Sequence, residues 1–172
     1  MAAGATYTPI ATTTLGSGQT SVTFSSIAST YSDLIVVMNY SQSGSEYPSL
    51  QFNGDTGTNY SWLDVGGNGT SAVSYSGNTV ASIPFLGYVV SGSNWGNVIA
   101  HINNYANTNM WKTIVSYDGN PPNFLAATSG STELMINTWR STAAISSIQI
   151  GTNNGATYAA GSMFTLYGIK GA

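Results

Sequence analysis

Charged residues are scarce in this chain. Only 5% of its 172 residues are Asp, Glu, Lys or Arg, comprising three basic and six acidic residues with a formal net charge of -3, whereas a soluble domain is about 25% charged. Three basic residues cannot form the positive footprint that a phosphate backbone requires. We therefore expect no nucleic-acid partner and no stabilising network of surface ion pairs.

Cysteine is absent altogether, which excludes disulfides and thiolate metal sites. No apolar run approaches the roughly 18 residues that span a bilayer, and the first residues lack the basic and apolar regions of a signal peptide. We therefore expect a protein that is made in a cytoplasm and does not insert into a membrane.

Neutral polar residues take the place of charge. The chain has 24 Ser, 21 Thr, 16 Asn and 20 Gly, and it is 42% hydrophobic and 12% aromatic. Disordered chains combine low hydrophobicity with high net charge, so this composition predicts a folded protein. A chain of this length buries roughly 70% of its unfolded surface as one domain, and we expect a single domain.

Short stretches of alternating apolar and polar residues recur along the chain, as expected for half-buried β-strands. Leu34–Tyr40 is apolar on both faces, which indicates a strand covered on two sides or lying at an interface. The other expected strands are Tyr7–Thr14, Thr20–Phe24, Ser49–Phe52, Tyr60–Val65, Val80–Phe85, Asn97–Asn103, Lys112–Tyr117, Glu133–Trp139, Ile145–Ile150 and Met163–Ile169. Turn dipeptides such as Asn53-Gly54 and Asn154-Gly155 separate them. This pattern predicts an all-β sandwich or barrel with little or no helix.

The residues that could carry catalysis are few. His101 is the single histidine, and without a neighbouring nucleophile it indicates a structural or surface residue. A glycosidase needs two carboxylates about 5 to 10 Å apart, and the six carboxylates are Asp33, Glu46, Asp55, Asp64, Asp118 and Glu133. Four of these lie at strand ends or in turn-rich stretches, so we expect no enzyme and no cofactor.

Two further patterns concern binding. The segment Asn53–Asp64 has oxygen ligands at alternate positions like a calcium loop, but its glycine and its last ligand do not fit that motif, which favours a hairpin turn rich in Asx contacts. Trp95 and Trp111 flank loops rich in Ser, Asn and Gly, where a β-sandwich usually carries its binding surface. We predict that these two tryptophans contact a ligand or partner.

Several segments together resemble small structural proteins and fibre modules of tailed bacteriophages, cyanophages among them. The segments are Tyr7–Leu15, Val22–Leu34, Gln51–Tyr60, Trp139–Ile145 and Gly161–Lys170. The resemblance implies a single β-sandwich domain of jelly-roll type, here residues 15–172, on the exterior of the virion. The strand pattern gives about eight to eleven strands in all, Tyr7–Thr14 included. It implies either a capsid decoration (cement) protein, usually a homotrimer, or a module of a tail or head fibre, and it brings no catalytic residues.

The scarcity of charge favours the decoration protein. Unpaired strand edges are normally guarded by charged residues, so here they must be covered by other copies, by the major capsid protein or by other virion proteins. Residues 1–14 are expected to form an extended arm, with Tyr7, Pro9 and Ile10 contacting the capsid or a neighbouring subunit, because proline disfavours a central strand. The alternatives are a fibre or receptor-binding module, and a carbohydrate-binding sandwich whose exposed Trp and Tyr contact a host surface glycan.

Overall fold

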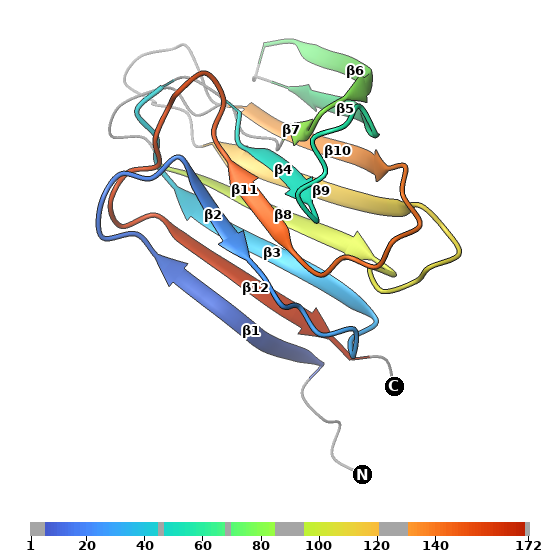
Figure 1. Ribbon diagram of the computed structural model, residues 1–172. Coiled ribbons are helices and arrows are strands. Elements are labelled where there is room, and N and C mark those ends of the chain that lie inside the picture. Colours follow the sequence, from blue (N-terminus) through green and yellow to red (C-terminus); the bar gives the residue numbers. More distant parts are fainter. Residues whose placement is uncertain (1–5, 45–46, 68–69, 85–94, 121–130, 171–172) are drawn as a thin grey trace.

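The computed structural model describes residues 6–44, 47–67, 70–84, 95–120 and 131–170. These residues form twelve β-strands in two antiparallel sheets and no helix (Figure 1), which confirms the all-β fold. The strands are β1 (Tyr7–Thr14), β2 (Ser21–Phe24), β3 (Asp33–Tyr40), β4 (Ser49–Phe52), β5 (Tyr60–Gly67), β6 (Ala72–Val80), β7 (Ile83–Pro84), β8 (Gly96–Asn103), β9 (Lys112–Asn120), β10 (Ser131–Trp139), β11 (Ile148–Gly151) and β12 (Met163–Ile169).

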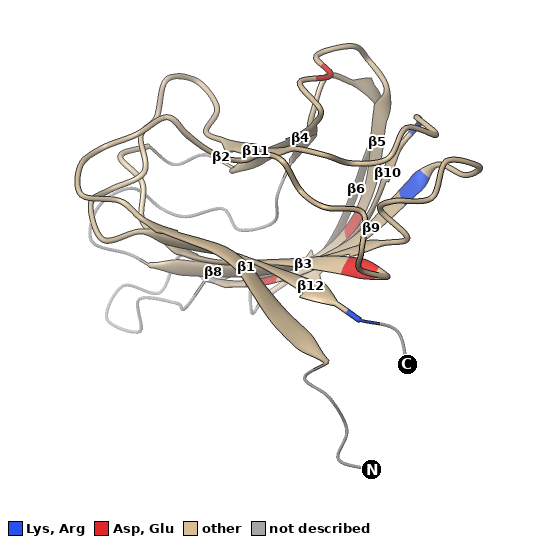
Figure 2. Ribbon diagram, turned by 60° about the horizontal axis from the view of Figure 1, so that its bottom comes forward, with Lys and Arg blue, Asp and Glu red and all other residues tan. Residues whose placement is uncertain are grey.

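The two sheets differ in size. The larger has eight strands in the order β1-β12-β3-β8-β9-β10-β5-β6, and the smaller has four in the order β2-β11-β4-β7. The smaller sheet lies over the β1-β12-β3-β8 part of the larger one (Figure 2). The remaining four strands belong to two antiparallel pairs that are consecutive in the chain, β5–β6 and β9–β10. These two hairpins widen the larger sheet to eight strands.

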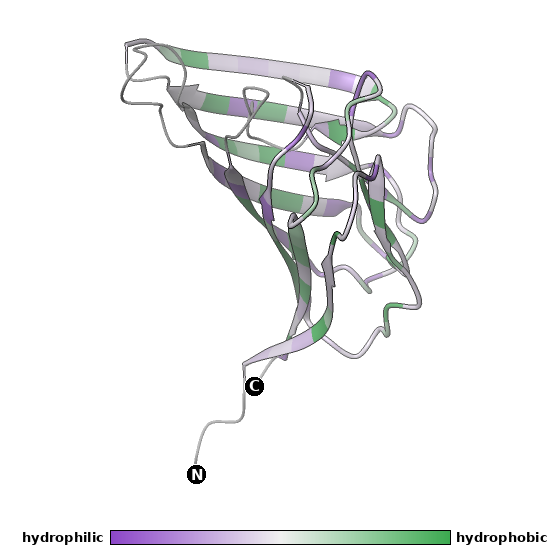
Figure 3. Ribbon diagram, turned by 90° about the vertical axis from the view of Figure 1, so that its left-hand side faces the viewer, coloured by the Kyte–Doolittle hydropathy of each residue, from purple (hydrophilic) through white to green (hydrophobic). Residues whose placement is uncertain are grey.

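The core lies between the two layers. Side chains alternate between the two faces of a strand, and Figure 3 shows hydrophobic and hydrophilic positions alternating along the larger sheet. The inward positions of β3 are Leu34, Val36, Met38 and Tyr40, all completely buried. Burying a side chain of this size contributes about 1.5 to 3 kcal/mol, so this alternation fixes which face of the sheet turns inward.

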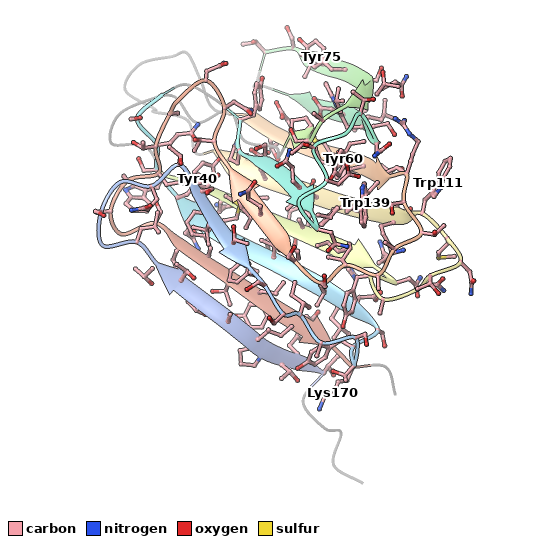
Figure 4. The ribbon with its side chains drawn as sticks, in the orientation of Figure 1. Tyr40, Tyr60, Tyr75, Trp111, Trp139 and Lys170 are labelled. Atoms are coloured by element: carbon pink, nitrogen blue, oxygen red, sulfur yellow. The ribbon has the colours of Figure 1, made fainter. Side chains whose placement is uncertain are left out.

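An aromatic cluster joins the two sheets. The ring of Phe52 on β4 lies 5.4 Å from that of Trp139 on β10, and Tyr60 on β5 stacks on the same indole at 6.3 Å; Figure 4 shows Tyr60 and Trp139 side by side. The indole N–H of Trp139 donates a 2.7 Å hydrogen bond to Oδ2 of Asp55, and the Tyr60 hydroxyl donates to the Asp55 carbonyl. Asp55 thus ties the β4–β5 connection to the cluster.

The segment Asn53–Asp64 is therefore structural. Asp55 Oδ1 accepts hydrogen bonds from the Gly57 backbone and from the Asn59 side chain, which are the Asx contacts expected from the sequence. The segment does not form a hairpin, however, because β4 and β5 belong to different sheets. It is the crossing from the smaller sheet to the larger.

Most strand predictions are confirmed, and the errors have physical causes. Strand β6 is missing from the predictions because it alternates weakly, contains Gly77 and leaves most of its residues exposed on both faces. The prediction of one strand at Val80–Phe85 is wrong, since Val80 ends β6, β7 is only Ile83–Pro84, and Phe85 lies outside the described residues. Twelve strands are present where about eight to eleven are expected.

The turn predictions hold at two positions. Asn53 and Gly54 have φ angles of +54° and +67°, and Asn154 and Gly155 have +50° and +76°. Asparagine and glycine tolerate this left-handed backbone better than other residues, so both dipeptides serve as sharp turns.

The described part of the expected N-terminal arm, from residue 6 onward, is β1, which pairs with β12 at the edge of the larger sheet. Pro9 occupies this edge strand, where a missing N–H can face solvent, and the register shifts between Pro9 and Ala11. Ile10, at this irregularity, packs against the core. From Tyr7 to Thr14 the segment is therefore an edge strand of the larger sheet.

The Asp55 contacts yield a stability prediction. Burial alone would raise the pKa of Asp55, but hydrogen bonds from Trp139, Asn59 and Gly57 outweigh it and hold the pKa below the usual 3.8. Because the pKa of Asp55 is lower in the folded protein than in the unfolded chain, its ionisation stabilises the folded protein at pH values above the unfolded pKa. This stabilisation is lost as the pH falls through the folded pKa. We expect Asp55→Asn to lower the free energy of unfolding by about 1 to 3 kcal/mol at pH 7, because the buried indole donor loses a charged acceptor.

Urea unfolding of the wild type and of Asp55→Asn at pH 7 and at pH 3 checks this expectation. The difference between the two proteins should shrink at pH 3, where the wild-type carboxylate begins to take up its proton. A difference that is the same at both pH values would contradict the role given to the charge.

Candidate functional site

The two tryptophans predicted to contact a ligand lie at opposite ends of the larger sheet. Trp95 directly precedes β8 and Trp111 directly precedes β9, and these strands run antiparallel. A strand of eight residues is about 27 Å long, so the two indoles do not share one site. Both are exposed, Trp95 by 45% and Trp111 by 57%, and Figure 4 shows Trp111 at the margin of the molecule.

The residues predicted for a subunit or capsid interface lie on β1. Tyr7 and Pro9 are exposed, whereas Ile10 is half-buried. They occupy one edge of the larger sheet, and β6 occupies the other. They are thus accessible to a neighbour along that edge.

The structure places the single histidine and the six carboxylates at different positions. His101 Nε2 lies 3.3 Å from Asp33 Oδ2 on the far side of the larger sheet from the core, and Asp55 serves the aromatic cluster. Glu46 lies outside the described residues. The other three carboxylates, Asp64, Asp118 and Glu133, come together on the inward side of β5, β9 and β10.

The side of the larger sheet that faces away from the smaller sheet is apolar, and we call it the outer face. Two rows of side chains cross it in register on β5, β10, β9, β8 and β3. One row is Leu63, Ile136, Val115, His101 and Ile35, and the other is Val65, Leu134, Tyr117, Ile99 and Val37. On β5, β9 and β10 the apolar side chains of these rows are 44–52% exposed, apart from half-buried Val115.

The border of the outer face is mostly neutral and polar. Positions next to the two rows carry neutral groups such as Ser61, Thr113, Thr138, Thr132 and Asn97, and the exception is Asp33, next to Ile35 on β3. An open hollow whose lining includes Val65, Tyr117, Leu134 and Glu133 lies at this face. An apolar centre with a polar rim is the usual anatomy of a protein interface, and contiguous apolar patches on a soluble protein usually mark such sites.

A second feature lies on the inward side of the two hairpins, and we call it the acidic pocket. It has a volume of about 350 Å³ and is lined by Tyr47, Trp62, Asp64, Tyr75, Ser76, Pro84, Glu133 and Met135. Cross-strand pairing places Asp64 between Met135 on β10 and Tyr75 on β6. Three aromatic rings and two carboxylates thus share one concave site.

The carboxylates in and beside the acidic pocket disfavour one another's ionisation. Burial, followed by the charges of Glu133 and Asp64, raises the pKa of Asp118 to about 7. Burial, followed by the charge of Asp64, raises the pKa of Glu133, and burial raises that of Asp64. Asp64 is only 3% exposed, yet its Oδ1 atom has no hydrogen-bond partner among the described residues.

This pocket was not predicted from the sequence, although part of its signal is visible there. The alternation in Tyr60–Val65 places Trp62 and Asp64 on one face of a strand. Tyr75 belongs to β6, which was not predicted, and the approach of Asp64 to Glu133 depends on strands that are far apart in the chain. No three His, Asp or Glu side chains of the described ranges converge in a way that would hold a metal ion.

Comparison with known proteins identifies no relative: no family model matches the chain, and no curated protein or solved structure is significantly similar to it. Among the described residues there is no helix long and apolar enough to cross a membrane.

The raised pKa of Asp118 predicts that stability decreases as the pH rises. In the unfolded chain Asp118 ionises near its usual pKa of 3.8, and in the folded protein its pKa is about 7. The free energy of unfolding therefore falls as the pH rises from 3.8 to 7, and the loss stays constant at higher pH. Asp118 Oδ1 accepts a 3.0 Å hydrogen bond from the Glu133 backbone N–H, and an asparagine Oδ1 keeps this bond. We expect Asp118→Asn to be more stable than the wild type by about 1 to 3 kcal/mol at pH 8.

Thermal or urea unfolding of both proteins between pH 4 and pH 8 tests this. The two curves of stability against pH should converge near pH 4, where the wild-type carboxyl is largely neutral in the folded state and begins to take up its proton in the unfolded state. Parallel curves over the whole range would show that Asp118 ionises normally.

Proposed function

We propose that this protein is a non-enzymatic capsid decoration protein of a tailed bacteriophage, which docks on the assembled shell through its outer face. The observation that carries the proposal is the pair of apolar rows that crosses five adjacent strands without a Lys, Arg, Asp or Glu. The resemblance of the chain to small phage structural proteins supplies the virion context. The outer face is the part of the surface best suited to the interface.

The strand order supports the jelly-roll type that the resemblance implies. Four strands of the larger sheet, β1-β12-β3-β8, lie opposite the whole smaller sheet, β2-β11-β4-β7, and the chain alternates between the layers except at β4 and β7. Two intertwined Greek keys of this kind define the jelly roll. We infer that the hairpins β5–β6 and β9–β10 are insertions into such a fold, and they carry most of the exposed apolar residues of the outer face.

Strand β6 supports assembly with neighbouring copies, for which we expect a homotrimer. It is an edge strand of nine residues without a charged residue or a proline, and such an edge pairs readily with another chain unless it is covered. Figure 2 shows how few charged residues the molecule presents. A neighbouring copy that covers β6 would prevent its edge from pairing with unrelated chains.

Shell stabilisation follows from mass action. A protein that binds only the assembled shell shifts the equilibrium away from disassembly in proportion to its occupancy. Because the two rows themselves carry no Asp, Glu, Lys or Arg, docking depends on apolar burial, which salt screens little. We therefore expect binding to persist as the ionic strength rises.

Substitution at the outer face tests this proposal. Leu134 is 44% exposed at the centre of the apolar rows, and Met110 is 47% exposed away from them. We expect Leu134→Lys to bind decoration-free expanded capsids of the phage at least about tenfold more weakly than the wild type, since a buried ammonium costs much more than an exposed one. Met110→Lys is the matched control and should bind normally.

Co-sedimentation with capsids measures binding, circular dichroism confirms folding, and light scattering measures the number of copies per oligomer. Equal loss for both variants, or no loss for Leu134→Lys, would contradict docking through the outer face. Quantitative mass spectrometry of purified virions separates decoration, at hundreds of copies, from a fibre or receptor-binding module, at a few dozen or fewer. Binding to a glycan array that is lost in Trp95→Ala or Trp111→Ala would instead support carbohydrate recognition.

A further inference from the structure

The acidic pocket contains negative charge that the protein itself does not offset. Asp64 and Glu133 line it, and Asp118 faces Glu133 across the β9–β10 pair. The basic side chains of the chain are engaged elsewhere. Lys112 Nζ donates to the carbonyls of Asn107, Met110 and Thr142, Arg140 donates to the Thr58 carbonyl, and Lys170 follows β12 at the far end of the sheet (Figure 4).

One polar atom in this pocket lacks a partner although it is almost completely buried. Asp64 is 3% exposed, and its Oδ1 accepts no hydrogen bond from the described residues. A buried carboxylate oxygen without a donor costs free energy in the unoccupied protein. A donor brought by another molecule would remove that cost.

Two glycines allow the pocket walls to lie flat on the sheet. A Cβ atom on Gly77 would stand 2.3 Å from Nε1 of Trp62, and one on Gly66 would stand 2.5 Å from Cγ of Glu133. The indole and the glutamate side chain therefore rest directly on backbone that bears no side chain. This packing holds an aromatic face and a carboxylate at fixed positions on either side of Asp64.

The chemistry of the pocket favours one kind of ligand. A metal ion would need converging ligands, which the described residues do not supply. A neutral sugar could stack on Trp62 and Tyr75 but would leave the carboxylate charge without a counterpart. A guanidinium group is planar and cationic, stacks on aromatic rings, and donates paired hydrogen bonds to a carboxylate. Lysine is a compact and strongly hydrated charge that stacks less well.

We propose that the acidic pocket binds an arginine side chain of a partner protein, with the guanidinium against Trp62 and its N–H groups donating to Asp64 and Glu133. The pocket lies on the opposite side of the larger sheet from the outer face, so this contact is independent of the proposed docking on the shell. It would join the protein to a second neighbour, and its failure would leave the docking proposal untouched.

A titration of the intact protein with Nα-acetyl-L-arginine methylamide tests the proposal. The readout is the Trp62 indole N–H resonance in nuclear magnetic resonance spectra, identified as the signal that is missing from Trp62→Phe. We expect a saturable shift that weakens with added salt, and no shift with the citrulline analogue, which has nearly the same shape but no charge. Absence of a saturable shift, or equal binding of the citrulline analogue, would overturn the proposal.

Two variants make the assignment specific. Asp64→Asn keeps the shape of the side chain and removes the buried charge, so it should fold normally and bind the arginine compound about tenfold or more weakly. Gly77→Ala should weaken binding by displacing Trp62, whereas Gly16→Ala is the matched control because its Cβ meets nothing within 4 Å. Unchanged affinity in Asp64→Asn, or binding of methyl glycosides that survives in that variant, would sink the arginine assignment.

Discussion

The structure depends on a mismatch between the two sheets. An apolar sheet face is stabilised when another layer covers it, yet here a four-stranded sheet faces an eight-stranded one. In the extension formed by β9, β10, β5 and β6, Phe52 of β4 packs on Trp139 and inward side chains such as Ile114 and Asn137 are buried, whereas the outer side carries exposed apolar side chains. The outer face and the acidic pocket are the two sides of this extension.

The two sides of this extension differ in their burial and in their side chains. On the outer face, exposed residues such as Leu134 and Ile136 lie in rows that no described segment covers. On the inward side, the aromatic cluster around Trp139 closes one end of the extension against β4, and carboxylates occupy the other end beside β7. Most of the inward side of the two hairpins is buried, and the acidic pocket lies beside β7 where Glu133 and Trp62 are half-buried.

The scarcity of charged residues explains why the carboxylates and the strand edge lack nearby basic side chains. In a chain with many ionic residues, three carboxylates on one sheet face would be matched by lysine or arginine nearby, but here Lys112 is completely buried and held by backbone carbonyls. An unguarded edge such as β6 would elsewhere carry lysine. The same composition thus leaves apolar rows, a strand edge and buried carboxylates that no charged side chain of the described residues offsets.

The sequence by itself determined the local structure and the fold class, whereas only the tertiary structure decided which residues form a site. Alternation in stretches such as Leu34–Tyr40 depends on neighbours two residues apart, and the positive φ of Asn53-Gly54 depends on the residues themselves, so both can be inferred without tertiary contacts. Strand β6 escaped prediction because packing against β5, rather than its own pattern, makes it a strand. The sequence places Trp62 and Asp64 in one strand, but nothing local brings them to Glu133 about 70 residues later, because the pairing of β5 with β10 is a long-range contact. Which strands become neighbours depends on the burial of the whole core, and that burial is a property of the complete fold.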